Sequence, residues 1–137
     1  RKKVRAPELP DVDRFFHAPG LAQRVTFDTK VRVPIANVDL MIPYAYQNGA
    51  LNLVKPQRFA TIEPALRLAC EGDMLQRHPE NGCARKLIVL PVVEESDHGR
   101  SLRRQVSEVF GEYHIRVVHH DQVTAFTEEV EREAHLV

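Results

Sequence analysis

Residues 38–55 read VDLMIPYAYQNGALNLVK. Two strand-like runs, Val38–Gln47 and Ala50–Lys55, flank the pair Asn48-Gly49. An Asn-Gly pair favours a two-residue type I′ turn, because both central residues need a positive φ and these two residue types tolerate it best. The stretch therefore predicts a β-hairpin, and the register of that hairpin predicts which side chains share a face.

A two-residue loop places Asp39 opposite Arg58 and Ala45 opposite Asn52, and it puts Tyr44 and Tyr46 on the same face as Lys55. The two tyrosines are expected there either as a binding patch beside Lys55 or as cover for the helix over Ile62–Met74. Side chains alternate along a strand, so Asp39 and Lys55 are expected on opposite faces, and Asp39 is expected to pair with Arg58. Pro43 indicates an edge strand or a bulge. A bulge at Pro43 would bring Asp39 and Lys55 to the same face, because one extra residue reverses the alternation beyond it.

Other elements follow from hydrophobic periodicity. Arg24–Pro34 alternates as a half-buried strand, and a short helix is predicted at Asp11–Phe16. Thr61 and Asp121 are candidate N-caps of later helices. The elements expected after the hairpin are a helix over Ile62–Met74, a strand at Leu87–Val93, a helix over Leu102–Phe110, a strand at Ile115–Val118 and a helix over Val123–Ala134.

This element order predicts an α/β fold. Short connections make the first three strands antiparallel, and two later β-α-β crossovers add parallel strands. We expect a mixed β-sheet of about five strands with helices packed on its faces. Residues 1–10 are interpreted as a basic tail or linker, and residues 11–137 as a single domain that is either complete or a fragment of a longer protein.

Composition is that of an ordinary globular domain: 137 residues with a net charge of zero. No apolar run approaches the ~18 residues of a membrane span, so no membrane association is expected. Residues 1–35 hold eight basic and four acidic side chains (net +4), whereas residues 107–137 hold two basic and seven acidic ones (net −5). Two cysteines, Cys70 and Cys83, favour a reducing, cytoplasmic setting with inert thiols packed in or near the core.

Asp39 opens the second strand and Lys55 ends the third. With these residues, the α-β-β-β-α-β order resembles the PD-(D/E)XK, or restriction-endonuclease-like, superfamily over roughly residues 11–93. The resemblance implies that Asp39 and an acidic-x-Lys motif ending at Lys55 bind Mg²⁺ and position a water against a phosphodiester. Leu53 occupies the acidic position. A second match to the motif is Asp11 with Asp28-Thr29-Lys30. Asp11 is expected in or near a helix and Asp28 on the first strand, which are not the elements that carry the motif in this superfamily.

The sequence analysis therefore predicts a bacterial-type domain with a degenerate metal site that contacts DNA, RNA or a protein partner without cleaving. One alternative is an active Mg²⁺-dependent nuclease whose missing carboxylate comes from Asp28 or Glu63. Another is a protein-interaction or homodimerisation domain without a cofactor. The candidate binding residues are Tyr44, Tyr46, Gln47, Asn52 and Arg58, and the candidate catalytic residues are Asp39 (also the metal ligand) and Lys55. His114, His119 and His120 are expected at a solvent-exposed strand end, and Ser107 has no nucleophile-elbow context.

Overall fold

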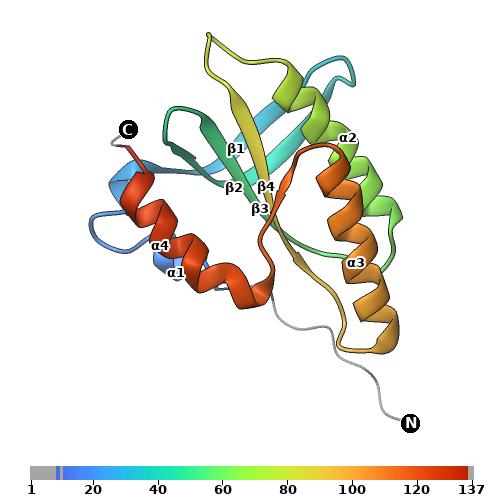
Figure 1. Cartoon of the computed structure of the whole chain (residues 1–137). Coiled ribbons are helices and arrows are strands. Elements are labelled where there is room, and N and C mark those ends of the chain that lie inside the picture. Colours follow the sequence, from blue (N-terminus) through green and yellow to red (C-terminus); the bar gives the residue numbers. More distant parts are fainter. Residues whose placement is uncertain (1–8, 10, 136–137) are drawn as a thin grey trace.

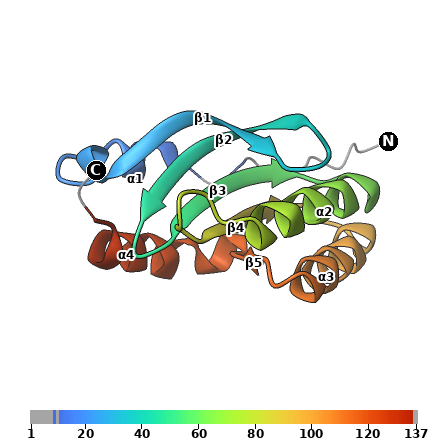
Figure 2. The same cartoon turned by 90° about the horizontal axis from the view of Figure 1, so that it is seen from above.

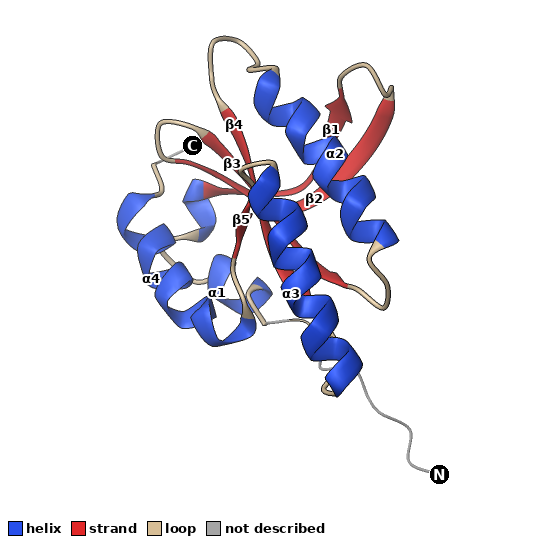
Figure 3. Cartoon of the chain, turned by 45° about the vertical axis from the view of Figure 1, so that its right-hand side comes forward, coloured by secondary structure: helices blue, strands red, loops and turns tan. Residues whose placement is uncertain are grey.

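The computed structural model of the chain describes Leu9 and residues 11–135, so most of the predicted tail at residues 1–10 lies outside the described residues. Strands and helices follow the predicted order (Figures 1 and 3). The strands are β1 (Val25–Val33), β2 (Val38–Gln47), β3 (Leu51–Arg58), β4 (Arg85–Val92) and β5 (Arg116–Val117). The helices are α1 (Asp13–Phe16), α2 (Glu63–Arg77), α3 (Asp97–Glu112) and α4 (Val123–Glu133), with short 3₁₀ turns at Ala22–Arg24 and His120–Gln122.

The sheet has the order β1-β2-β3-β4-β5. β1, β2 and β3 are antiparallel neighbours, and β4 and β5 continue parallel to β3. The prediction of an α/β fold with a five-stranded mixed sheet is confirmed. Helices α2 and α3 lie on one side of the sheet and α1 and α4 on the other (Figures 1 and 2), as right-handed crossovers through α2 and α3 require.

Two hydrophobic clusters hold these layers together. Helices α2 and α3 bury one cluster against the sheet, and α1 and α4 bury the other. The α2–α3 cluster includes Leu53, Ala69, Leu87, Val106 and Phe110, and the α1–α4 cluster includes Phe16, Tyr46, Val54, Phe126 and Val130. Both faces of β3 and β4 are therefore covered, which explains the continuous apolar run of β4.

The hairpin turn differs from the prediction. Asn52 lies opposite Tyr46, one residue from its predicted position, so the loop has three residues instead of two. Gly49 has a positive φ of 100°. Asn48 Oδ1 accepts hydrogen bonds from the Ala50 amide (3.4 Å) and from Asn52 Nδ2 (2.7 Å). These bonds draw Ala50 into the loop, which is why the predicted type I′ turn is wrong.

The changed register separates the two tyrosines from Lys55. Tyr44 and Tyr46 pack in the α1–α4 cluster together with Val54, whereas Leu53 packs in the α2–α3 cluster. Lys55 follows Leu53 by two residues and so lies on the α2–α3 side. The expectations that both tyrosines share a face with Lys55, or that they cover the helix over residues 62–74, are wrong.

At Asp28 and Pro43 the same face of the β1–β2 ribbon changes from packing in the α1–α4 cluster to packing in the α2–α3 cluster. Val25 packs in the α1–α4 cluster and Val31 in the α2–α3 cluster, although they lie on one side of the alternation. Asp28 has a φ of 50°, and the ladder omits its pair with Pro43. The register is the same on both sides of this point, so Pro43 adds no bulge residue.

β3 extends beyond its predicted end at Lys55 because it stays paired with β4 after its pairing with β2 has ended. β2 pairs with β3 only as far as Val54, while β4 pairs with β3 through Arg58. Pro56 therefore lies where one edge of β3 has no neighbouring strand, a position that tolerates the missing N–H of proline.

Two predicted helix caps and one cysteine also need correction. The N-cap of α2 is Ile62 and not Thr61, and no side chain caps this helix. Asp121 lies inside the 3₁₀ turn before α4 instead of capping that helix. Ser96, which the sequence analysis missed, caps α3 by accepting a hydrogen bond from the Gly99 amide. Cys70 is exposed on α2 and does not pack in the core.

Candidate functional site

The residues at the implied Mg²⁺ positions do not fit a metal site. Leu53 is 0% exposed and lies in the α2–α3 cluster, so the third strand offers no carboxylate there. Asp39 lies opposite Arg32, with which it forms an exposed ion pair of 3.3 Å, so the predicted Asp39–Arg58 opposition is wrong. Arg58 is exposed at the end of β3. Within residue 9 and residues 11–135, no group of three or more His, Cys, Asp or Glu side chains could hold a metal ion.

Lys55 meets a different carboxylate from those predicted. Its Nζ donates to the Met41 carbonyl (3.4 Å), which the separation of β2 from β3 leaves available. Burial lowers the pKa of Lys55, and the Glu71 carboxylate on α2 partly opposes that shift. Burial likewise raises the pKa of Glu71, against the influence of Arg67 and Lys55. Asp28 and Glu63, the alternatives from sequence, are exposed elsewhere.

The other predicted binding residues divide between core and cavity. Tyr44 is buried, its hydroxyl donates to Asp13 Oδ1 (2.9 Å), and its ring stacks on Phe16, so it has a structural role. The Gln47 carbonyl accepts from the His135 amide, which fixes the end of the chain beyond α4. Tyr46 and Asn52 line a cavity described below.

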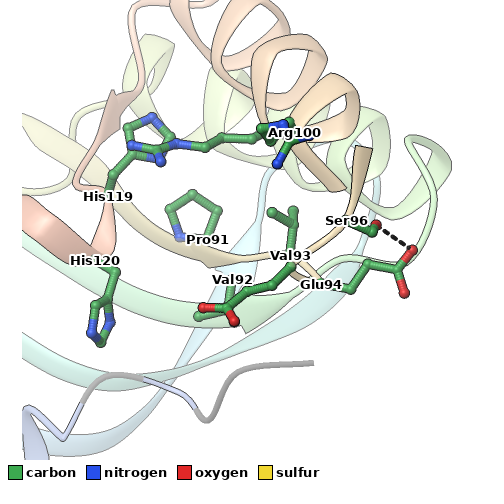
Figure 4. Close-up of a pocket in the computed structure, with 10 residues that line it drawn as sticks. Pro91, Val92, Val93, Glu94, Ser96, Arg100, His119 and His120 are labelled. Carbon is green, nitrogen blue, oxygen red and sulfur yellow. Dashed lines mark hydrogen bonds between the residues drawn. The ribbon is translucent and has the colours of Figure 1, made fainter. Parts of the chain in front are cut away.

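The carboxyl ends of β4 and β5 enclose a cavity of about 440 Å³, here called the carboxyl-end cavity (Figure 4). Open parallel sheets commonly bind ligands at this edge, where the strands end and helices begin. Arg100 and His119 lie on one side of Pro91, and Glu94 turns toward Ser96, whose hydroxyl donates to it (3.0 Å). The lining residues are Pro91–Ser96, Arg100, Arg103, His119 and His120.

His119 is held in place by its neighbours. Its ring nitrogen Nε2 lies 2.9 Å from Ser107 Oγ, its backbone amide donates to Gln122 Oε1 (3.0 Å), and its carbonyl accepts from the Gln122 amide (2.8 Å). Burial first, and then Arg103, lower the pKa of His119, which stays neutral at pH 7. The contact with Ser107 positions the His119 ring on the wall of the carboxyl-end cavity.

Both arginines of the carboxyl-end cavity are held by exposed carboxylates. Arg103 pairs with Asp121 (3.3 Å), and Arg100 pairs with Asp97 one turn earlier on α3. Exposed ion pairs contribute only about 0–1 kcal/mol, so an incoming anion can displace them at little cost. Glu95, exposed on the rim, opposes such an anion.

A second cavity, about 550 Å³, lies at the opposite end of the sheet beneath α4 and is here called the amino-end cavity. Tyr46, Asn52 and Lys86 form a row across β2, β3 and β4, because each lies directly opposite the next. Glu129 and Glu133 of α4 line the other side. Tyr46 and Asn52 are predicted binding residues, but their enclosure depends on how α4 packs on the sheet, which the residue pattern of the strands does not indicate.

No protein-family model, curated protein or solved structure matches this chain. Among the described residues, no helix combines the length and apolar character needed to cross a membrane. The site assignments therefore depend on the geometry and chemistry of the residues themselves.

Proposed function

We propose that this chain is a restriction-endonuclease-like domain that contacts the phosphates of a nucleic acid without cleaving it. The carboxyl-end cavity carries the proposal, because Arg100 and Arg103 reach it from the first two turns of α3. The α-β-β-β-α-β order also supports the resemblance.

Anion binding is favoured at this edge by more than the two guanidinium groups. The positive end of the α3 dipole points the same way, and this helix is 16 residues long. His120 adds a ring nitrogen that can donate to phosphate oxygens. The buried Leu53 supports the absence of cleavage, since a Mg²⁺-dependent phosphodiesterase needs carboxylates where that side chain lies.

Fluorescence anisotropy with single- and double-stranded DNA and RNA, over a range of salt concentrations, tests the proposal. We expect an affinity that falls as salt rises, because phosphate contacts release counterions. The double variant Arg100→Ala/Arg103→Ala should bind more weakly and lower the slope of log K against log salt by about 2. Glu95→Gln should strengthen binding, because it removes the opposing charge.

Arg104→Ala is the matched control, since Arg104 is exposed on the same helix but does not line the cavity. It should leave the salt slope closer to that of the parent protein. No binding to any of the four nucleic acids at low salt would contradict the proposed function. Cleavage that requires Mg²⁺ and stops with a chelator would contradict the non-cleaving part and favour the nuclease alternative.

A specific observation also favours the second candidate, a protein-interaction domain. Ile35 is 78% exposed at the tip of the β1–β2 ribbon, and Val38 and Met41 are exposed beside it. β1 is an edge strand of the sheet, which can accept a further strand. Light scattering after size-exclusion chromatography would detect a homodimer, and Ile35→Asp should dissociate it if this tip forms the contact.

A further inference from the structure

Three buried polar side chains with unused hydrogen-bonding atoms line the amino-end cavity: Tyr46, Asn52 and Arg85, whose Nε has no partner among the described residues. Tyr46 is 2% exposed and Asn52 is 4% exposed. Within the described part of the chain, neither the Tyr46 hydroxyl nor Asn52 Oδ1 has a hydrogen-bond partner, although neither atom is sealed from solvent. Polar atoms that face the solvent of a cavity are paired by water, and a ligand that displaces this water can take its place as their partner.

The orientation of the Asn52 amide is fixed by the hairpin turn. Its Nδ2 lies near three acceptors: Asn48 Oδ1 (2.7 Å), the Ala50 carbonyl (3.0 Å) and the Tyr46 carbonyl (3.4 Å). A flipped amide would place an oxygen against these oxygens. Asn52 therefore presents its own oxygen as an acceptor, and a ligand must offer an N–H to it.

A carboxylate lies on the same wall. Asn48 Nδ2 donates to Glu133 Oε2 (3.5 Å) while Asn48 Oδ1 accepts from Asn52, so one asparagine links both acceptors. Two acceptors on one wall suit a ligand group that carries two N–H donors, such as an amino group. The Tyr46 hydroxyl, on the neighbouring strand, can donate to an acceptor beside that amino group.

The remaining lining favours a neutral ligand with an apolar body over an organic cation. Ile88, on the side of the sheet that α4 covers, supplies apolar surface. Lys86 and Arg116 add positive charge, and Arg116 is held by both carboxylate oxygens of Glu129. A volume of about 550 Å³ lies within the ~300–1,000 Å³ range of small-molecule sites.

The roof of the cavity is well anchored, so the cavity is preformed. The Arg24 guanidinium donates to the carbonyls of Glu131 (3.1 Å) and Ala134 (3.2 Å) at the end of α4. The His135 amide donates to the Gln47 carbonyl (2.7 Å) beside the hairpin turn. These contacts join the end of α4 to the 3₁₀ turn before β1 and to the end of β2.

We propose that the amino-end cavity binds a nucleobase that carries an exocyclic amino group next to a ring nitrogen, as adenine and cytosine do. The amino group donates to Asn52 Oδ1 and Glu133, and the Tyr46 hydroxyl donates to the ring nitrogen. Lys86 lies at the exposed rim, where it can contact the sugar or a phosphate. This site lies at the opposite end of the strands from the carboxyl-end cavity and goes beyond the proposed function.

Amide chemical-shift titrations with free nucleosides test the inference, and they carry no phosphate, so they are independent of the nucleic-acid proposal. Adenosine or cytidine should shift the amides around residues 46–52 and 84–88, and should bind at least tenfold more tightly than inosine and uridine. Inosine is the matched probe because a carbonyl replaces the amino group of adenosine and the adjacent ring nitrogen carries a proton, so both hydrogen bonds would be lost. Tyr46→Phe should weaken binding of the amino-bearing nucleosides about tenfold, the loss of one hydrogen bond.

Tyr46→Phe should fold normally, because the hydroxyl has no hydrogen-bond partner among the described residues. Tyr113→Phe, outside the cavity, is the matched control and should leave the affinity unchanged. Three results would each overturn the inference: no shifts around the cavity with millimolar adenosine or cytidine, equal affinity for inosine and adenosine, or unchanged affinity in Tyr46→Phe.

Discussion

Replacing Leu53 by glutamate would create the acidic-x-Lys motif that the family resemblance implies. The structure predicts that this substitution destabilises the fold. Leu53 is 0% exposed beneath the α2–α3 layer. The substitution forfeits the burial of a leucine side chain, about 1.5–3 kcal/mol. Holding the new carboxyl group protonated at pH 7, against an ordinary pKa near 4.3, costs about 3.7 kcal/mol more. Together these costs approach the ~5–15 kcal/mol stability of a typical domain.

The penalty of Leu53→Glu should depend on pH in a defined direction. Burial raises the pKa of the new carboxyl group in the folded state, so the folded state binds a proton that the unfolded state releases above pH ~4.3. The variant should therefore lose about 1.4 kcal/mol of stability per pH unit, relative to Leu53→Gln, as pH rises from ~4.3 to 7. Urea unfolding followed by circular dichroism at several pH values measures this difference.

Leu66→Glu is the matched control, because Leu66 is 44% exposed on α2. It should change the unfolding free energy by no more than about 0.5 kcal/mol. If Leu53→Glu unfolds at the same urea concentration as Leu66→Glu, or gains Mg²⁺-dependent nuclease activity, Leu53 does not lie in the core and the argument for a degenerate site is refuted.

The remaining predictions concern backbone space and titratable groups. Gly99→Ala should lower stability by at least ~2 kcal/mol, because its Cβ would lie 1.7 Å from a backbone carbonyl oxygen that cannot move cheaply. Tyr44→Phe should cost about 1–1.5 kcal/mol through the lost hydrogen bond to α1. Burial, and then a nearby carboxylate, raise the pKa of Tyr46 to about 12, so stability should fall as pH rises from 10 to 12 by ~1.4 kcal/mol per unit for this residue. Lys55→Met should keep the unfolding free energy within about 1 kcal/mol, because it removes a cation whose pKa burial lowers.

These predictions are checked by a comparison variant or by the outcome that would contradict them. Gly111→Ala, on the same helix with no atom within 4 Å of the added Cβ, should stabilise by up to about 1 kcal/mol instead. Tyr46→Phe should cost little and should remove part of the alkaline loss that absorbance near 295 nm detects. A Lys55→Met variant that unfolds much more readily would show that the electrostatic attraction between Lys55 and Glu71 outweighs the desolvation of Lys55.

Sequence periodicity predicted the elements and the mixed sheet because apolar spacing directly reflects which faces are buried. It did not predict the hairpin register, because the decisive interactions come from the side chain of Asn48, which bonds to Ala50 and Asn52 and lengthens the loop. Nor does periodicity indicate that Asp28 takes a positive φ, at the point where the β1–β2 ribbon passes between the clusters. A local side-chain hydrogen bond can thus shift a whole strand by one residue.

The same one-residue shift decides which candidate residues meet. With the predicted register, Asn52 would lie opposite Ala45 and both tyrosines would lie beside Lys55. In the structure, Asn52 lies opposite Tyr46 on the face that α4 covers, while Lys55 faces α2 and Glu71. Contacts between segments distant in sequence then complete each site: α4 with the hairpin turn, and α3 with the segment after β5. Residue types alone carry no information on these contacts, so the chemistry of both cavities could be derived only after the strands were in register.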